Sequence, residues 1–474
     1  MTGLATFGYR SPWQCKVFAM DTLIMEDFRC FAGRHEIPLA PLTLLVGENS
    51  SGKTSFLAAV RLAWDATHER SEWINFNEEP FPLGTFRDIA RKSGARGPRA
   101  SEFALGLTRK PSLARPRVQP SLVPVPGDRP IREVAQEVRF VEDAGLATAG
   151  TRIIRSPLVS VRLRPEKKGR SELEIRTQSA DPAKIPPELE SLPPWADWYY
   201  VFRRIAGADR RGQNSLGIPT HEFEELGELL ESTRLRDREA TRPYAFAPVR
   251  SRPLRSYSPF RDVPDPEGQH VPLVLARALG NRSEGDSALA AALALFGRSS
   301  GLFDSIQASV DGKKPGNPFE ILVKRGSVTR NLVDIGYGVS QVLPILVEIF
   351  TSPPGGTFLV QQPEVHLHPK AQAALSSLFG QLAAGGRQLI VETHSDYIVD
   401  RIRMDIRDGK GVTSEDVSLL YFEPTKHGAK IHRLRFTEDG EVCGVGEAGE
   451  DTDVPPGYRA FFLKESLRLY TGVS

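Results

Sequence analysis

Apolar and polar residues alternate along the chain from Val17 and then give way to an unbroken apolar run, Leu42 to Val46. Such a run is typical of a strand that is buried on both faces of a sheet. A glycine-rich turn follows, and after it Leu57, Val60 and Trp64 recur at helical spacing. The pattern therefore predicts a strand, a loop and a helix in the order found in phosphate-binding α/β domains.

A second group of α/β signals begins near residue 319 and ends near residue 436. Its expected strands are Phe319–Lys324, Thr357–Val360, Gln388–Glu392 and Val417–Phe422. Its expected helices are Gln341–Phe350, Lys370–Leu382 and Tyr397–Arg403. Neither group contains a complete sheet, so we expect the two groups to meet in one mixed sheet.

The segment between these groups has a different character. Residues 110–129 are rich in proline and predict an extended loop. Antiparallel strands are expected at Val138–Glu142, Leu158–Leu163 and Leu173–Arg176, and a helix at Glu222–Glu231. We therefore predict an α/β fold with a mixed sheet, split by an α+β insertion. Its expected units are an N-terminal half (17–109), the insertion (110–300), a C-terminal half (301–438) and a C-terminal tail (439–474).

Composition narrows the class of protein. Of the 474 residues 40% are hydrophobic and 25% are charged, as in ordinary globular proteins. The longest apolar run, Ala288–Phe296, is shorter than the ~20 residues of a membrane-spanning helix. Residues 1–16 lack the pattern of a secretion signal, so we expect a cytoplasmic protein without membrane contact. Cys15, Cys30 and Cys443 are too few and too widely spaced for a disulfide scaffold or a zinc ribbon.

Charge leaves room for a local nucleic-acid surface only. The formal net charge is +2, which excludes the whole chain as a polycationic partner of DNA. One segment near residue 255 interleaves arginines with aromatic residues that could stack on bases. The arginines of this candidate DNA surface are Arg250, Arg252, Arg255 and Arg261, and the aromatic residues are Tyr257 and Phe260. The alternative interpretation is an arginine face turned to solvent or to another domain.

The glycine-rich turn matches the motif G-x-x-x-x-G-K-[ST] in full, from Gly47 to Thr54. Its glycines allow backbone N–H groups to point at a phosphate chain at the positive end of the following helix. We expect Lys53 to reach the β- and γ-phosphates of ATP and the Thr54 hydroxyl to bind Mg²⁺. The predicted ATP-binding residues of this P-loop are Gly47, Glu48, Asn49, Ser50, Ser51, Gly52, Lys53, Thr54 and Ser55.

A second glycine-rich turn, residues 334–341, delivers Ser340 to the start of an apolar helix, where anions bind readily. This segment, DIGYGVSQ, is followed by VLP and resembles the signature motif of the overcoming-lysogenization-defect (OLD) ATPases, an ABC-type, SMC-like family. In that family the signature serine contacts the γ-phosphate held by a second subunit. The resemblance implies this role for Ser340, with Gly338 and Gln341 beside it.

A third motif, residues 357–369, resembles the Walker B strand and PExHLHP segment of the same family. The family places two acids at the end of this strand, one beside Mg²⁺ and one beside the attacking water. Here these positions are Gln361 and Gln362, and an amide cannot act as a general base. The amides are either a natural variant or an engineered substitution that traps ATP. We therefore expect ATP binding with slow hydrolysis.

The segment after the strand Gln388–Glu392 resembles the switch-histidine motif, in which an imidazole senses the γ-phosphate. The resemblance implies this role for His394, and Glu364 and Glu392 are the nearest acids that could replace the missing base. His366, His368 and His394 could suggest zinc by number. The spacing His-x-His nevertheless fits the family's D-loop better than a zinc site.

The resemblance covers Phe18 to about Phe436 and leads to a functional hypothesis. OLD nucleases continue into a TOPRIM domain, whereas only 80 residues follow His394, so we expect no nuclease domain in this chain. The leading hypothesis is a nucleotide-driven homodimer or larger homo-oligomer, the ATPase subunit of a bacterial anti-phage defence system with a separately encoded nuclease or toxin as effector. The alternatives are a DNA repair or recombination ATPase that binds DNA directly, and a pseudo-ATPase scaffold.

Overall fold

The structure is a computed structural model of the 474-residue chain. It describes residues 20–68, 74–94, 97–109, 133–166, 170–179, 183, 185, 192–193, 198, 200–201, 204–205, 216–236, 241–258, 263–280, 284–310, 317–426 and 428–461.

The strand that leads into the P-loop lies in the middle of an eight-stranded sheet, with strand order β18-β17-β16-β15-β3-β14-β13-β9. Strands β15, β3, β14, β13 and β9 run parallel, and β16, β17 and β18 add antiparallel strands at one edge. The strands are β3 (Leu42–Gly47), β9 (Tyr244–Phe246), β13 (Thr357–Gln361), β14 (Gln388–Glu392), β15 (Val417–Thr425), β16 (Gly428–Phe436), β17 (Val442–Val445) and β18 (Asp451–Thr452). Because β3 pairs with strands from the second group of signals, the predicted α/β class with a mixed sheet is confirmed. The expected strand Phe319–Lys324 is an exception, since it lies in a separate three-stranded sheet.

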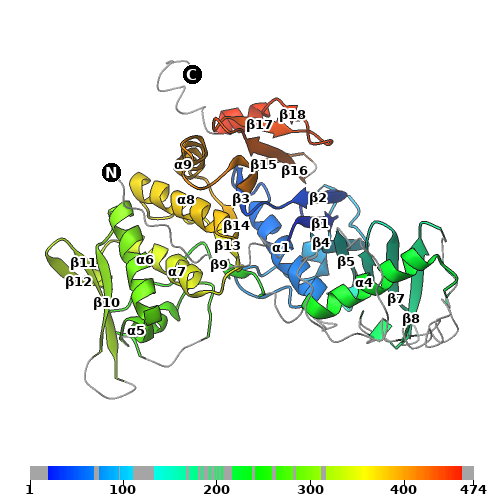
Figure 1. Ribbon diagram of the computed structural model, residues 1–474, viewed down its shortest axis with the longest axis horizontal. Helices are drawn as coiled ribbons and strands as arrows, with labels where there is room; N and C mark the ends of the chain where they lie inside the picture. Colours follow the sequence, from blue (N-terminus) through cyan, green and yellow to red (C-terminus); the bar gives the residue numbers. More distant parts are fainter. Residues whose placement is uncertain are drawn as a thin grey trace.

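A seven-stranded antiparallel sheet, in the order β2-β1-β4-β5-β6-β7-β8, lies on the other side of the P-loop helix α1 (Lys53–His68) (Figure 1). Its strands are β1 (Thr22–Glu26), β2 (Arg34–Pro38), β4 (Glu102–Arg109), β5 (Val134–Asp143), β6 (Leu146–Arg155), β7 (Val159–Glu166) and β8 (Arg170–Thr177). Since β4 and β5 are neighbours in this sheet, the boundary predicted at residue 110 does not coincide with a sheet edge. The predicted loop at 110–129 lies outside the described residues, and the domain boundaries stay a prediction.

Helices cover the face of the eight-stranded sheet opposite α1 (Figure 1). These helices are α5 (Val271–Gly280), α6 (Glu284–Ser300), α7 (Tyr337–Thr351), α8 (Pro369–Ala384) and α9 (Asp396–Arg407). A three-stranded sheet packs against α5 and α6, with strands β10 (Ser305–Val310), β11 (Phe319–Arg325) and β12 (Val328–Asn331). Further helices in the described part of the chain include α2 (Phe86–Ile89), α4 (Thr220–Arg236) and the 3₁₀ turns Leu332–Asp334 and Ser414–Asp416.

Alternation along the buried strands fills a core on each side of the sheet. In β3, Leu44 and Val46 pack with the helices α5 to α9, whereas Leu45 packs with α1 and the antiparallel sheet. A strand that is buried on both faces favours apolar residues at successive positions, which is why four of the five residues from Leu42 to Val46 are apolar. The exception, Thr43, is buried with its Oγ1 hydrogen-bonded to the Ala40 backbone. A third core joins α4 to β7 and β8. The sequence thus places α1 between two sheets and the P-loop at their junction.

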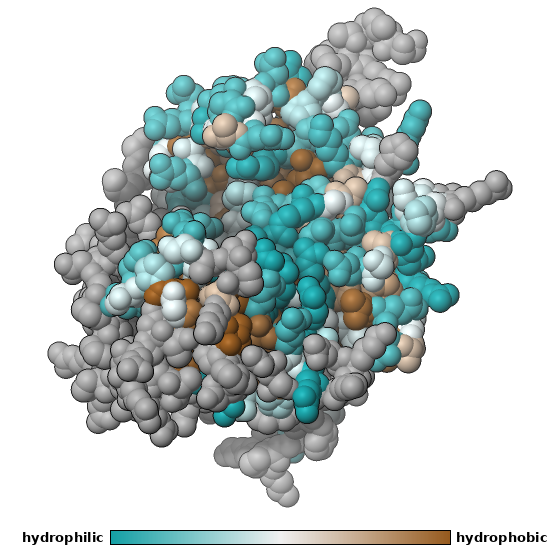
Figure 2. Space-filling model, turned by 90° about the vertical axis from the view of Figure 1, so that its right-hand side faces the viewer, coloured by the Kyte–Doolittle hydropathy of each residue, from teal (hydrophilic) through white to brown (hydrophobic). Residues whose placement is uncertain are grey.

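The described surface is mainly polar where it is viewed from the β7 and β8 end of the molecule, with hydrophobic side chains scattered in small groups (Figure 2). The apolar run Ala288–Phe296 lies within α6. Within the described part of the chain, no helix is both long enough and apolar enough to cross a membrane.

Candidate nucleotide-binding site

The P-loop connects the end of β3 to the start of α1, as predicted. Gly47 has φ 143°, and a Cβ atom at this position would lie 2.4 Å from the Phe422 carbonyl oxygen, so only glycine fits here. The Lys53 Nζ donates hydrogen bonds to the carbonyls of Gly47 at 2.9 Å and Glu48 at 2.6 Å. Burial lowers the pKa of Lys53, and the carboxylates of Glu392 and Glu364 oppose this shift. The lysine is thus held inside the loop by the loop's own carbonyls.

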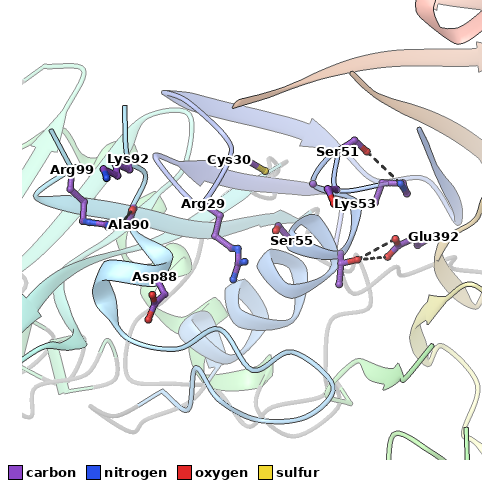
Figure 3. Close-up of a pocket in the computed structure, with 13 residues that line it drawn as sticks. Arg29, Cys30, Ser51, Lys53, Ser55, Asp88, Ala90, Lys92, Arg99 and Glu392 are labelled. Atoms are coloured by element: carbon purple, nitrogen blue, oxygen red, sulfur yellow. Dashed lines mark hydrogen bonds between the residues drawn. The ribbon is translucent and has the colours of Figure 1, made fainter. Parts of the chain in front are cut away.

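Glu392 faces the P-loop threonine from the end of the neighbouring strand β14. The Thr54 Oγ1 donates to the Glu392 Oε2 at 2.9 Å and lies 3.2 Å from Oε1 (Figure 3). The Glu392 side chain is buried, and burial raises its pKa while the Thr54 hydrogen bond and Lys53 oppose the shift. The predicted magnesium residue Thr54 therefore contacts a carboxylate, and that carboxylate comes from β14.

Gln361, the other residue expected beside Mg²⁺, points elsewhere. Its Nε2 donates to the Phe246 carbonyl on β9 at 3.2 Å, and the side chain is buried. The reason is the strand order, because β14 separates β13 from the P-loop strand β3. Gln362 has φ 42°, and its backbone N–H donates to the Glu392 carbonyl at 2.8 Å. In this structure the Gln361 amide is therefore part of the β9–β13 edge, and its role beside Mg²⁺ stays a prediction.

Glu364 and His394 lie against each other beside the P-loop. The Glu364 Oε1 accepts a hydrogen bond from the His394 backbone N–H at 2.7 Å, and Oε2 is buried without a hydrogen-bond partner. Burial raises the pKa of Glu364. Burial lowers the pKa of the His394 imidazole, Lys53 lowers it further, and a hydrogen bond to the Gly47 backbone opposes both. The fold thus brings both candidate acids and the candidate switch histidine to Lys53.

The signature segment, residues 334–341, starts the helix earlier than its sequence suggests. Helix α7 begins at Tyr337 with Gly336 as its N-cap, so Ser340 lies one turn inside it. The Ser340 Oγ donates to the Tyr337 carbonyl at 2.9 Å, and the side chain is buried. A Cβ atom on Gly338 would lie 2.8 Å from the His366 carbonyl oxygen, so the helix start packs directly on the loop after β13. The helix thus begins four residues before the expected Gln341, Ser340 lies at the end of its first turn, and the role of Ser340 stays a prediction.

The three histidines have separate structural surroundings. His368 is the N-cap of α8, and its Nδ1 accepts from the Ala371 backbone N–H at 3.3 Å. The His366 ring lies 5.6 Å from the ring of Tyr337, measured between centroids. In the described residues no group of three or more His, Cys, Asp or Glu side chains is placed to hold a metal ion.

The predicted arginine surface for DNA is corrected by burial. Arg250 is only 2% exposed, although it is one of the four arginines of the segment. Arg255 is exposed but forms an ion pair with Asp334 at 2.6 Å. Arg252 is exposed, whereas Arg261 and Phe260 lie outside the described residues. Tyr257 stacks on Phe319 with a centroid distance of 5.6 Å. Arg250 turns inward because it packs between α7 and β13. The local sequence, which is rich in arginine, gives no sign of this contact.

Two family profiles match the chain. The profile described as "AAA domain, putative AbiEii toxin, Type IV TA system" matches residues 149–400, more than half of the 474 residues. The chain belongs to this AAA family. A second profile, described as AAA domain, matches residues 22–84 and so includes the P-loop. No curated protein matches the sequence of this AAA chain. The finer resemblance to OLD ATPases stays a prediction.

The AAA chain is also similar to solved head domains of SMC proteins. An SmcHead bound to the C-winged helix domain of ScpA is 12% identical with a TM-score of 0.44, over 88% of this chain and 97% of that one. An Smc head domain with an extended coiled coil bound to the C-terminal domain of ScpA, derived from Pyrococcus furiosus, is 11% identical with a TM-score of 0.39, over 88% and 96%. The SMC head domain from Thermotoga maritima is 12% identical with a TM-score of 0.35, over 87% and 97%.

Sequence reasoning missed part of the pocket of this AAA domain. A cavity of about 500 Å³ opens over the P-loop. Glu392 lines it at one end, and Arg29, Lys92 and Arg99 line it away from Glu392 (Figure 3). Arg29 has φ 51°, an unusual value for a residue other than glycine. The three cations come from loops of the antiparallel sheet, so no local motif connects them to the P-loop. Together they give the pocket a positive rim suited to a polyanion.

Proposed function

We propose that this AAA protein binds ATP with Mg²⁺ in the P-loop pocket and uses it to switch between separate and associated subunits, with slow hydrolysis. The observation that carries the proposal is the hydrogen bond between Thr54 and Glu392 within a pocket rimmed by cations. A phosphate chain on the P-loop amides would lie between Lys53 and this acid–hydroxyl pair. The arrangement combines anion binding with an oxygen-rich cation site, as a magnesium nucleotide requires.

The residues at the bottom of the pocket fit Mg²⁺. A hydroxyl and a carboxylate are the hard oxygen ligands that this ion prefers, and Thr54 and Glu392 would hold it. When bound, the ion neutralises charge on the β- and γ-phosphates. Glu392 thereby supplies the negative charge that the family takes from the end of the Walker B strand, where this chain has Gln361. The electrostatic role passes from β13 to β14.

In this proposal, Lys53 exchanges its hydrogen-bond partners when ATP binds. Its Nζ gives up the carbonyls of Gly47 and Glu48 and donates to phosphate oxygens instead. A charge-assisted hydrogen bond of this kind contributes about 1.5–3 kcal/mol. The exchange turns an inward-facing ammonium group into the main positive contact of the nucleotide.

Slow hydrolysis follows from the acids that remain. Gln362 has no basic group, and Glu364 is the nearest carboxylate on the histidine side, with one oxygen on the His394 N–H and one oxygen free. We assign Glu364 to the attacking water and His394 to the γ-phosphate. If phosphate release is absent even from associated protein, the two amides favour the pseudo-ATPase scaffold instead.

Association is proposed to bury the start of α7. Exposed apolar side chains surround the signature segment, including Val249 at 71%, Leu254 at 57% and Tyr337 at 51% exposure. We propose a sandwich in which each of two copies holds ATP between its own P-loop and the signature segment of the other. The family that matches is described as "AAA domain, putative AbiEii toxin, Type IV TA system". This supports a role as the ATPase subunit of an anti-phage defence system that controls a separate effector.

The sandwich is tested at Tyr337, because Ser340 is buried and a charged replacement there would disturb the fold. Tyr337→Arg should leave ATP affinity of the single subunit within about twofold and abolish ATP-dependent association, measured by calorimetry and light scattering. Met404→Arg, on the exposed face of α9, is the matched control and should associate normally. Lys53→Ala should lose ATP binding itself. ATP-induced association of Tyr337→Arg at the level of wild type would contradict the sandwich.

A further inference from the structure

Arg250 is a buried arginine that the nucleotide site described above does not use. It follows β9, and it is among the largest fully buried side chains of the described residues. Its backbone N–H donates to the Gln341 Oε1 at 3.1 Å, and its carbonyl accepts from the Gln341 Nε2 at 3.3 Å. Gln341 follows Ser340 on α7. The backbone of Arg250 is therefore joined to the signature helix by two hydrogen bonds.

The guanidinium group reaches from this anchor to the end of the Walker B strand. Its Nη2 donates to the Gln361 carbonyl at 2.7 Å, while Nε and Nη1 are buried without hydrogen-bond partners. Burial lowers the pKa of Arg250 to about 10, and the nearby charge of Glu364 opposes this shift. A buried cation without a bonded carboxylate destabilises a fold, and replacement by an apolar residue of similar volume often has no stability cost. Stability alone gives no reason for an arginine here.

Glu364 has a buried acceptor atom that lacks a hydrogen-bond partner, whereas Arg250 has buried donors that lack one. The Glu364 Oε1 accepts the His394 N–H, whereas Oε2 is buried with no partner at hydrogen-bond distance. Burial raises the pKa of this carboxyl, and the Thr393 hydroxyl is among the groups that lower it. Arg250 and Glu364 therefore influence each other through their charges without forming a hydrogen bond in this form of the protein. Arg250 thus has two buried donors without partners, and Glu364 has one buried acceptor without a partner, while the two groups lie near enough for their charges to interact. A charge-assisted hydrogen bond between them would satisfy both groups.

We propose that Arg250 is a positioning residue that connects the signature helix α7 to Glu364, and so couples closure of the sandwich to hydrolysis in the same subunit. The inference rests on the proposed ATP-driven switch. When the nucleotide of the second copy presses on the start of α7, Gln341 moves with the helix and carries the backbone of Arg250 with it. The guanidinium then donates to the free oxygen of Glu364, which keeps this carboxylate ionised and fixes its direction.

The first test separates binding from turnover. Arg250→Met keeps an unbranched, flexible side chain but removes the guanidinium group and its charge. Arg252→Met is the matched control on an exposed arginine of the same segment. Arg250→Met should bind ATP within about threefold of wild type and still associate with ATP, while turnover of the associated protein falls about tenfold, a typical size for coupling between sites. Arg250→Lys should recover part of this loss, because it restores a donor and the charge.

Protein concentration shows whether the loss is one of coupling. In wild type and in Arg252→Met, turnover per subunit should rise as the subunits associate. In Arg250→Met it should stay at the level of the separate subunit, although light scattering shows association. Equal rises in all three proteins would overturn the inference. A merely structural arginine predicts a different result, namely weaker ATP binding and a lower melting temperature with no change in the dependence of turnover on association.

A double-mutant cycle tests the route through Glu364. Arg250→Met, Glu364→Gln and the double variant are compared in turnover at saturating ATP. If Arg250 acts through Glu364, the double variant is no slower than the slower single variant. If the two losses multiply, Arg250 does not act through Glu364 and the inference is wrong. If wild type does not associate with ATP, the proposed switch fails, and this cycle alone then decides whether Arg250 positions Glu364. Should Arg250→Met fail to fold, the same cycle is measured with Arg250→Lys.

Discussion

Strands β13 and β14 end side by side in the parallel sheet, where Gln361 is paired with Glu392. The side chains of these two residues nevertheless bond to different parts of the molecule. Glu392 accepts the Thr54 hydroxyl at the P-loop, whereas the Gln361 amide donates to the Phe246 carbonyl on the outer strand β9. Both side chains are buried. One closes the nucleotide pocket, and the other closes the edge of the sheet.

This difference shows that the contacts of a residue in a sequence motif depend on which strands lie beside it in the sheet. In a parallel sheet, residues at paired positions point to the same face, so distance from the P-loop strand decides which of them reaches it. β14 is the direct neighbour of β3, and β13 is one strand further away. The acid at the end of β14 faces Thr54, whereas the amide at the end of β13 bonds to the outer strand β9.

The largest effect is expected from Glu392→Gln. It removes the only charged contact of the Thr54 hydroxyl in the described structure and should lower turnover by about 100-fold, within the range for loss of an essential acid or base. The magnesium concentration needed for ATP binding should rise as well, which calorimetry with a magnesium titration measures. Glu441→Gln changes an exposed carboxylate and is the control. Unchanged magnesium dependence would mean that β14 does not supply the cation site.

Gln361→Asp tests the other half of the comparison. A shorter carboxylate cannot donate to the Phe246 carbonyl, which then remains buried without its partner. We expect the free energy of unfolding to fall by about 1–3 kcal/mol, with no gain in magnesium affinity. Urea denaturation measures the first quantity and calorimetry the second. A clear gain in magnesium affinity would show that β13 can reach the ion after all.

Gln362→Glu should have a smaller effect of opposite sign. The residue lies just beyond β13, where a carboxylate could accept a proton from the attacking water, so turnover should rise by about tenfold. Repulsion from Glu364 and Glu392 limits the gain, because like charges raise one another's pKa. Steady-state phosphate release measures the rate. A decrease would contradict this expectation and show that a second carboxylate beside Glu364 hinders the reaction.

The smallest effect concerns pH. Burial raises the pKa of Glu364 above the ordinary value of 4.5, and only the ionised carboxylate accepts a proton. Activity should therefore be lost as pH falls through this raised pKa, at a higher pH than for an exposed glutamate. The measurement is turnover between about pH 5 and pH 8, where a raised carboxyl pKa is visible. If Glu364→Gln retained the same acidic limb, another group would be responsible for it.

Local pattern was sufficient for the elements that bind phosphate. The apolar run Leu42 to Val46, the glycines after it and the helical spacing of Leu57 and Val60 each depend on neighbours within a few residues, and the structure has the predicted strand, loop and helix. The strands at 357–360 and 388–392 were predictable for the same reason. These features follow from backbone periodicity and from the sterics of glycine, which act over short distances.

Tertiary structure alone decided which side chains meet. Arg250 looked like a surface cation, yet it is buried between α7 and the end of β13. Arg29, Lys92 and Arg99 join the pocket from a different sheet. Glu392 reaches Thr54 because β14 is inserted between β3 and β13. The sequence by itself determined the residue types and the local elements, while the strand order, a property of long-range pairing that no local pattern encodes, determined which acid serves the P-loop.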